Sequence, residues 1–528
     1  MKLNNQNVHT EHLAHLGIVA GVIKKIGLID KLDDILPKIS NNINISHGQS
    51  IAAMILNGLG FTERRLYLVS NFFQNKPVDK YLGNNVKAKD LNDDVLGRSL
   101  DQIYKYGTTK LFSEVAFKIG LETGLLGKSA HLDTSTLSVE GRYDDNETEV
   151  KITHGYSKDH RQDLKQITLS LTTTGEASFP IWMEALSGNS SDKTSFHKTI
   201  NSVINFQKDL KKSGPFYWVA DSALYSKDKL LSHDDSVLWI TRVPESIKVA
   251  KELITMSKLN WTCINEKYKF VEVGSYYGSI KQRWVIFESS QAKKREMITF
   301  NNKIDNQEKE IIKLIKIKTK ERFYSEEEIE KDLKSIKKKY KNFSFNIKTT
   351  DFTSKDKKYF KIIISFERDE TVIDMELKAK GRFIISTNNI VENISPEQLL
   401  IEYKNQSKTE KSFRFLKDDS FLLSDVYLKK PERVQALMVI MCLSLMVYNV
   451  GEYLLRSTLK NTNETVENLI KKQIAKPTLK MIFLLMRAVD LVTINLENET
   501  KYIVTNFTDN HQKILYLLGP EFSEMYDF

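Results

Sequence analysis

Cysteine is scarce in this 528-residue chain, and the scarcity argues against two common ways of stabilising a fold. The two cysteines, Cys263 and Cys442, stand far apart in the sequence, and neither belongs to a CxxC or Cys/His cluster. A disulfide framework or a zinc site is therefore not expected, and a reducing compartment fits this cysteine usage better.

The chain also lacks a long uninterrupted hydrophobic run. Its longest apolar stretch, residues 436–450, contains Ser444 and Asn449 and is shorter than the roughly 20 residues that a bilayer requires. Polar residues follow Met1, so no signal peptide is predicted. We expect a soluble, cytoplasmic protein with no membrane association, in which residues 436–450 form a buried helix.

Positive charge, by contrast, is in excess. Lysine and arginine number 78 against 68 aspartate and glutamate, which gives a net charge of +10. This balance favours a polyanionic partner such as nucleic acid, although a lysine-rich proteome explains it as well. The length allows two to four domains with a substantial core, and the apolar fraction is that of a globular protein.

The first 128 residues predict a helical N-terminal domain. Apolar residues recur at three- and four-residue intervals in 16–26 and 50–59, and another helix begins near Asp94 after an Asn/Asp-rich segment. Arg-bearing segments such as 63–65 suit DNA binding. A helical protein-interaction domain is an equally good interpretation, because helix-turn-helix signals are weak in a single sequence.

From Ser129 onward the pattern changes to that of strands. Segments 129–138, 166–174 and 179–186 are rich in alternating and β-branched residues, and a hairpin joins the last two. Asp133 lies inside the first of these segments, where a carboxylate costs free energy unless a metal ion or hydrogen bonds satisfy it. The alternative is an aspartate at a strand end that caps the next turn.

A polar segment between the first two strands carries a dense basic cluster. Its members Lys158, His160 and Arg161 lie beside the candidate site strand in sequence, and they are suited to contacts with a phosphate backbone. As a motif on its own, the cluster is also compatible with a solvated loop.

A second carboxylate follows a mostly apolar segment, 216–220. This pattern predicts a buried central strand with Asp221 at its C-terminal end, where ligands bind in open sheets. An aspartate that caps the next helix is the alternative. With a helix over 190–210 and a strand at 237–243, the order is three strands, a helix, a strand, a connection and a strand.

The third candidate carboxylate lies in a predicted helix over residues 401–417. At helical spacing, one face of this helix carries Tyr403, Ser407, Glu410, Arg414 and Lys417. A single carboxylate among cations suits a metal ion bound next to phosphates. A solvated helix with ordinary ion pairs is the alternative.

Together these motifs resemble DDE transposases of bacterial insertion sequences. The resemblance is to the branch whose third carboxylate lies in a Tyr-x2-Arg-x3-Glu-x6-Lys signature after a β-rich insertion. It covers roughly residues 10–490 in element order, and the segment 155–161 is also similar to this branch. The signature reads Tyr403-x2-Gln406-x3-Glu410-x6-Lys417 here, and the two strand-borne aspartates match Asp133 and Asp221.

The resemblance implies a fold and a chemistry. The fold would be an α/β RNase H-like core, a mixed sheet with helices on both faces, interrupted by a β/α insertion and flanked by helical N- and C-terminal regions. Asp133 would bridge two Mg²⁺ (or Mn²⁺) ions, and Asp221 and Glu410 would each hold one side. These ions would serve both phosphodiester cleavage and strand transfer.

The resemblance also implies residues that bind DNA. Tyr403 and Lys417 would position the cleaved strand, and Gln406 and Arg414 are further candidates for contacts with DNA. Gln406 stands where the family has an arginine, so a fixed cation that would grip a phosphate is missing here. Candidates to replace that cation are Lys404, Lys408 and Arg414.

An insertion separates the two parts of the predicted core. It contains strand-like segments at 268–273, 282–287 and 359–366 and a lysine-rich helical region at 290–340. The resemblance implies contacts with transposon-end DNA, in which Trp261 or Trp284 would stack on a flipped base. Ordinary core packing of each tryptophan is the alternative, and the lysine-rich helices are expected to form a solvated antiparallel hairpin.

These expectations divide the chain into five segments. Two apolar helices, at 432–455 and 479–492, are expected in the last of them. The segments are a helical N-terminal domain (1–128), the first part of the catalytic core (129–245), the insertion (246–380), the second part of the core (381–425) and a helical C-terminal region (426–528).

The function expected from the resemblance is that of a DNA transposase. Its partners would be double-stranded DNA, as terminal inverted repeats and target, and a second copy of the chain in a synaptic complex. One alternative is a metal-dependent RNase H-like nuclease without strand transfer. The other is a catalytically inactive remnant that still binds DNA.

Overall fold

A computed structural model describes most of the chain, and its residues group into two compact units. Unit 1 comprises residues 1–224, 233–238 and 404–528, and unit 2 comprises 225–232 and 239–403. The division into five segments stays a prediction. The described residues are 8–38, 45–61, 68–83, 85–143, 148–157, 161–190, 199–203, 217–220, 225, 237–277, 279–354, 357–390, 394–418, 428–496 and 499–528.

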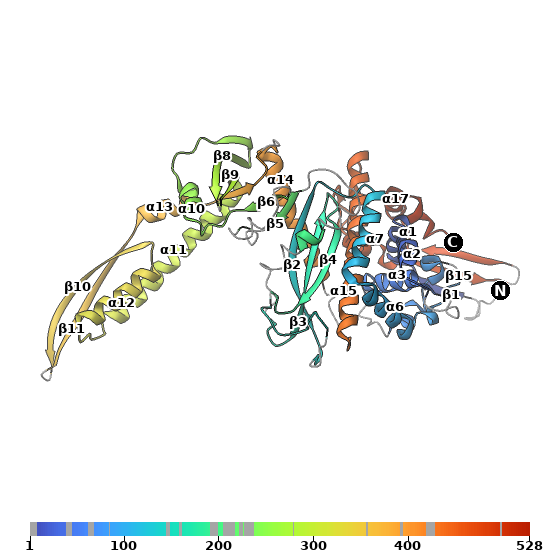
Figure 1. The fold of residues 1–528 in the computed structure, drawn as a ribbon, viewed down its shortest axis with the longest axis horizontal. Coiled ribbons are helices and arrows are strands. Elements are labelled where there is room, and N and C mark those ends of the chain that lie inside the picture. The colour runs from blue at the N-terminus through green and yellow to red at the C-terminus, as the bar shows by residue number, and fades with distance from the viewer. Residues whose placement is uncertain are drawn as a thin grey trace. The chain divides into compact units, whose positions relative to one another are not determined.

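A long apolar helix, α15 (Pro431–Thr462), forms the centre of unit 1. It is long and apolar enough to cross a membrane, but 83% of its most apolar window is buried inside the structure. This agrees with the predicted buried helix, although α15 extends well beyond the apolar run. Around it pack the N-terminal helices α1 (Leu16–Lys25), α3 (His47–Gly58), α6 (Asp93–Tyr106) and α7 (Thr108–Glu122) (Figure 1).

The predicted helix at 479–492 is only partly correct. Helix α16 spans Leu479–Leu485, and the chain then becomes a strand, β15 (Asp490–Asn495). Three of the six residues of β15 are β-branched (Val492, Thr493 and Ile494), which favours a strand over a helix. Strand β15 pairs antiparallel with β1 (Val8–His12) and with β16 (Thr500–Thr505), so the two ends of the chain share one small sheet.

Shorter elements complete the helical part of unit 1. Two C-terminal helices, α17 and α18, contact α15 and α1 respectively. The remaining elements are α2 (Leu28–Ile35), α4 (Val69–Phe73), α5 (Val78–Leu82), η2 (Ala88–Asp90), β13 (Val466–Glu467), β14 (Gln473–Ile474), η3 (Met486–Ala488), α17 (Asp509–Leu518) and α18 (Pro520–Glu524).

The sheet of unit 1 contains the predicted strands. In spatial order they are β4, β3, β2 and β5, with an antiparallel hairpin between β3 and β4 and a parallel pairing between β2 and β5. The sheet is therefore mixed, as expected for an α/β fold. The bounds are β2 (Ser129–Val139), β3 (Lys165–Thr174), β4 (Phe179–Ser187) and β5 (Tyr217–Ala220).

Helix α7 covers one face of this sheet. A side chain at Gly120 of α7 would meet the ring of Phe179 at 3.1 Å, so glycine allows the close approach of helix and strand. Phe179 lies opposite Thr174, and Thr174 lies opposite Ala130. Residues opposite each other on paired strands share a face, so these three define the face beneath α7.

Described strands of unit 2 form an antiparallel sheet around β12, the last predicted core strand. Strand β12 lies between β6 and β9, and β8 and β7 follow, so the strands of the insertion pair directly onto β12. The strands predicted at 268–273 and 282–287 are confirmed. The elements are β6 (Leu238–Arg242), β7 (Thr262–Asn265), β8 (Tyr268–Tyr277), β9 (Ile280–Ser289), β12 (Arg382–Thr387), α10 (Lys248–Thr255) and α13 (Glu370–Ala379).

The lysine-rich region forms a module with its own core. Helices α11 (Ser290–Lys318) and α12 (Glu326–Lys339) pack with a two-stranded ribbon of β10 (Phe343–Ser354) and β11 (Lys357–Arg368) (Figure 1). Ion pairs Lys318–Asp332 and Lys339–Glu310 show that the helices run antiparallel, as expected. We call these four elements the helix–ribbon module. Its core residues include Phe300, Ile304, Ile311, Phe323, Ile329, Ile336, Tyr340, Phe343, Ile362, Ile364 and Ile373.

Candidate active site

Asp133 lies within strand β2 and is half-buried. Its Oδ1 accepts a hydrogen bond from the backbone N–H of Thr134 at 2.8 Å, which partly satisfies a carboxylate inside the sheet. Alternate residues of a strand share a face, so Asp133 is on the same face as His131. Paired strand β3 presents Thr173 opposite His131 on that face.

The helix of the signature packs against this same face. Helix α14 (Pro396–Leu416) carries Thr409, whose Oγ1 lies 2.7 Å from Oγ1 of Thr173 in a fully buried hydrogen bond. Because Thr173 lies opposite His131, this bond fixes α14 over the sheet face that also carries Asp133. Glu410, which directly follows Thr409, is exposed.

Sequence reasoning missed the two threonines. Thr409 falls between Gln406 and Phe413 at helical spacing, and with Ser412 these residues form the buried side of this part of α14. That periodicity was readable in the sequence. Its partner Thr173 was not identifiable, since the pairing joins residues 236 positions apart.

A buried histidine lies beside the threonine pair. His131 is 3% exposed, and its Nε2 lies 3.1 Å from Oγ of Ser129. Burial, and to a smaller extent the positive charge of Lys408 on α14, lower the pKa of His131 to about 4. The Lys408 ammonium donates to the backbone oxygen of Glu176 at 3.3 Å, so α14 also contacts the β3–β4 turn.

Strand β5 lies next to β2, the strand that carries Asp133. It pairs in parallel with β2, with His131 in register with Val219, and it ends at Ala220. Asp221, the second predicted catalytic carboxylate, directly follows in sequence but lies outside the described residues.

The remaining signature residues differ in exposure. Gln406 is buried, at 8% exposed, so its amide does not lie on the solvent side of α14 where Glu410 and Arg414 are exposed. Lys417 is half-buried just after the helix and donates its backbone N–H to Phe413. Within unit 2, the ring of Tyr403 lies 6.3 Å from that of Phe383.

Only one member of the predicted basic cluster is described. Arg161 forms a two-bond ion pair with Asp163, through Nε at 2.9 Å and Nη2 at 2.7 Å, and both side chains are exposed. The guanidinium therefore already has a carboxylate partner. Lys158 and His160 lie outside the described residues.

The two tryptophans predicted to stack on a base occupy different surroundings. Trp284 is 1% exposed, and its indole N–H donates to Tyr225 and Gln282, both at 3.1 Å. Such burial is what core packing, the alternative interpretation, expects, and base stacking by Trp284 stays a prediction. Trp261 is half-buried, with Lys269 and Arg382 over its ring at 4.6 and 5.2 Å.

The carboxylates of this site are suited to a hard divalent cation. Aspartate and glutamate oxygens are the ligands that Mg²⁺ and Mn²⁺ prefer. Within the described part of the chain, no group of three or more His, Cys, Asp or Glu side chains is arranged to hold a metal. Because Asp221 is not described, the convergence of the three carboxylates stays a prediction.

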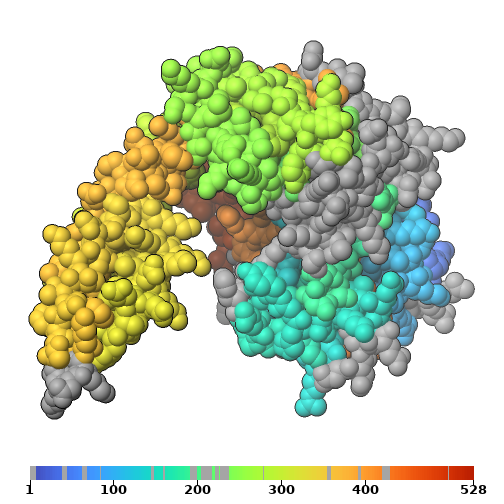
Figure 2. Space-filling model, turned by 60° about the vertical axis from the view of Figure 1, so that its left-hand side comes forward, coloured from blue at the N-terminus to red at the C-terminus, as the bar shows by residue number. Residues whose placement is uncertain are grey.

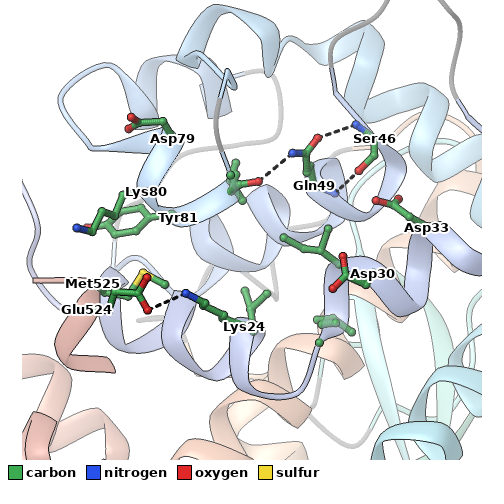
Figure 3. A pocket seen from close by; sticks show the side chains of 16 residues that line it. Lys24, Asp30, Asp33, Ser46, Gln49, Asp79, Lys80, Tyr81, Glu524 and Met525 are labelled. Carbon is green, nitrogen blue, oxygen red and sulfur yellow. Dashed lines mark hydrogen bonds and ion pairs between the residues drawn. The ribbon is translucent and has the colours of Figure 1, made fainter. Parts of the chain in front are cut away.

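A separate pocket of about 710 Å³ lies in the N-terminal part of unit 1 (Figure 3). Most of its polar side chains already have partners. Lys24 pairs with Glu524 at 2.7 Å, Asp33 accepts from the Gly48 N–H, and Gln49 donates to the Leu82 carbonyl. None of the predicted catalytic or DNA-binding residues lines this pocket.

Fold and site together define a class of protein: an α/β core with one carboxylate on a strand and another on the helix that covers it. A family model described as a transposase DDE domain matches residues 132–447, more than half of the chain. The chain belongs to this family of DDE transposases. The match confirms the resemblance inferred from Asp133, Asp221 and the signature on α14.

Further comparisons add little about activity. Residues 8–117 match a family described as a domain of unknown function, DUF4277. A solved structure of a piggyBac transposase synaptic complex with hairpin DNA aligns over 89% of this chain and 79% of that chain, at 8% identity and a TM-score of 0.37. The search of curated proteins gives no match.

Proposed function

We propose that this transposase cleaves DNA at the ends of an insertion sequence and joins the freed 3′ end to a target, with an RNase H-like core as its catalytic part. The observation that carries the proposal is the bond between Thr409 and Thr173. It supports the assignment of Glu410 and Asp133 to one site, because α14 packs on the sheet face that carries the aspartate.

In this proposal Asp133, Asp221 and Glu410 hold two Mg²⁺ or Mn²⁺ ions, which would activate the attacking hydroxyl and stabilise the leaving oxygen. The exposed guanidinium of Arg414, one helical turn beyond Glu410, neutralises a phosphate of the bound strand. Lys417 and Tyr403 position that strand. The partners are double-stranded DNA and a second copy of the chain in a synaptic complex.

A cleavage and strand-transfer assay tests the proposal. Labelled DNA that carries the terminal repeats flanking the gene is incubated with Mg²⁺ or Mn²⁺ and the full chain. We expect Asp133→Asn and Glu410→Gln to lower cleavage at least about 100-fold, equivalent to about 2.7 kcal/mol of transition-state stabilisation. Glu499→Gln, an exposed carboxylate in an ion pair with Lys501, is the matched control.

The products separate the alternatives. Nicking at the ends followed by a joined product, lost in both site variants and retained in the control, supports the transposase. Metal-dependent cutting without joining identifies the nuclease. Binding without cutting by the unaltered chain identifies an inactive remnant, and the proposed activity is then wrong.

A second measurement tests which residues hold the ions. Fe²⁺ replaces Mg²⁺, hydrogen peroxide and ascorbate are added, and the hydroxyl radicals formed from the peroxide at the bound ion cut the nearby backbone. We expect cuts close to residues 133, 221 and 410. Cuts near only one of these positions would contradict a shared site.

A further inference from the structure

The ribbon of the helix–ribbon module has two chemically different faces. One face contributes Phe343, Ile362 and Ile364 to the core beneath α11 and α12. The other face follows from the register, since alternate residues point to opposite sides. On that face the cross-strand pairs are Phe352 with Tyr359, Thr350 with Lys361, and Lys348 with Ile363.

Residues before α12 extend this second face. Phe323 forms an antiparallel bridge to Phe360, with backbone N–H···O bonds of 3.0 and 2.7 Å, and both side chains pack with the module core. Arg322, the adjacent residue, therefore belongs to the opposite side. Its guanidinium carbon lies 4.8 Å from the ring centroid of Tyr359.

Aromatic rings and cations alternate on this surface, which we call the aromatic–cationic face: Arg322, Lys348, Phe352, Tyr359 and Lys361. The Phe352 and Tyr359 rings stack at 5.7 Å between centroids with an interplanar angle of 18°. The Lys361 ammonium lies 5.6 Å from the Phe352 ring centroid. The rings therefore stabilise two of the three cations in defined positions through cation–π contacts.

Carboxylates are kept away from this face within the described ribbon. Asp351 belongs to the core side, where it pairs with Lys358 at 3.0 Å. Glu367 shares the outer face but is four residues beyond Ile363, the partner of Lys348, and six beyond Lys361, roughly 13 and 20 Å at strand spacing. Among the described residues of the module, the face thus presents three cations without a neutralising acid. The module that carries it is yellow to light orange in Figure 2.

We infer that the aromatic–cationic face binds the phosphate backbone of DNA, an assignment that rests on the proposed function. Its cations are complementary to a polyanion, and rings that hold cations in place reduce the side-chain entropy lost on binding. Arg322 offers a planar fork of donors suited to phosphate oxygens, and Thr350 adds a hydroxyl between the cations. Such contacts read no base edges, so the binding is independent of sequence and strongly dependent on salt.

The test measures salt dependence with the full chain. A fluorescein-labelled duplex of mixed sequence is titrated at several KCl concentrations, and binding is followed by fluorescence anisotropy. The face variant carries R322Q, K348Q and K361Q. The control variant carries K309Q, K331Q and K338Q, three exposed lysines of α11 and α12, so the loss of charge in the module is the same.

Each neutralised phosphate contributes about 0.9 to the slope of log affinity against log salt. We expect the face variant to lower that slope by about 2 to 3 and to weaken binding more than tenfold near physiological salt. The control variant should change the slope by less than about 1. Equal losses in both variants, or no loss in the face variant, would overturn the inference.

Two further measurements keep the result interpretable. If the triple variant melts at a lower temperature than the unaltered chain, the single substitution K348Q, at an exposed position, is measured instead and should lower the slope by about 1. Cleavage is assayed on the same preparations. If the unaltered chain does not cleave DNA but the face variant lowers the salt slope, the proposed function alone is contradicted. If the chain cleaves DNA but the face variant leaves the slope unchanged, this inference alone is contradicted.

Discussion

At the scale of single residues, the site region places the buried His131 on the same sheet face as the candidate carboxylate Asp133. Burial holds the pKa of His131 near 4, and the nearby Lys408 acts in the same direction. In the unfolded chain the pKa returns to about 6.5. Between these two values the unfolded state binds a proton that the folded state does not, so stability falls as the pH falls from about 6.5 to 4.

The expected result is an acid-sensitive fold with His131 as one cause. A pKa difference of this size lowers the free energy of unfolding by roughly 3 kcal/mol once the pH is below both pKa values. We predict that His131→Gln reduces the slope of unfolding free energy against pH between 6.5 and 4, measured by urea denaturation. His15 is also buried, with its pKa lowered to about 4. Its contribution to the pH dependence of unfolding should remain in the His131→Gln variant, which provides an internal comparison. An unchanged slope would show that His131 titrates normally in the folded chain.

At the scale of elements, a buried hydrogen bond joins helix α14 to the sheet beneath it. Thr173 and Thr409 are both buried, so loss of one hydroxyl leaves its partner without that hydrogen bond. Thr409→Val or Thr173→Val alone should lower the free energy of unfolding by about 1–3 kcal/mol. The double valine variant should lose less than the sum, because both polar groups are then removed together. Chemical denaturation of the four proteins measures the coupling, and additive losses would mean that the bond does not fix the helix.

The same elements show what the sequence predicts well. Strands β2, β3, β4, β8 and β9 were found because their alternating and β-branched residues are local signals. The end of α16 was misjudged because apolar residues continue into β15, and a short apolar run fits either structure.

Fewer features of the candidate site can be predicted from the sequence. Asp133 and the signature on α14 are recognisable because they resemble a family motif. The Thr173–Thr409 bond and the neutral His131 depend on pairings between distant parts of the chain, which no local pattern specifies. The aromatic–cationic face required the register of β10 and β11, since a shift by one residue would place the same side chains in the module core.

At the scale of the whole chain, segments from the two termini pack together in unit 1. Strand β1 pairs with β15, and α1 contacts both α15 and α18. Helices α1 and α18 approach closely because α1 has glycines at the contact: a side chain at Gly21 would meet the Phe522 ring at 2.7 Å, and one at Gly17 would meet Tyr526 at 2.6 Å. The segment that matches DUF4277 thus completes its core with residues from the other end of the chain.

This packing predicts that a substitution near the C-terminus lowers the local stability of the N-terminal helices. Phe522 is fully buried, and Phe522→Ala should lower the free energy of unfolding by about 3–5 kcal/mol, the cost of a large cavity. Tyr516→Ala, at a position that is 79% exposed on the neighbouring helix, should change it by less than about 0.5 kcal/mol.

Hydrogen exchange provides the decisive comparison. In the Phe522 variant the amides of Leu16–Lys25 should exchange faster together with those of α17 and α18. Faster exchange confined to residues 509–524 would instead show that the N-terminal helices are stable without their C-terminal partner.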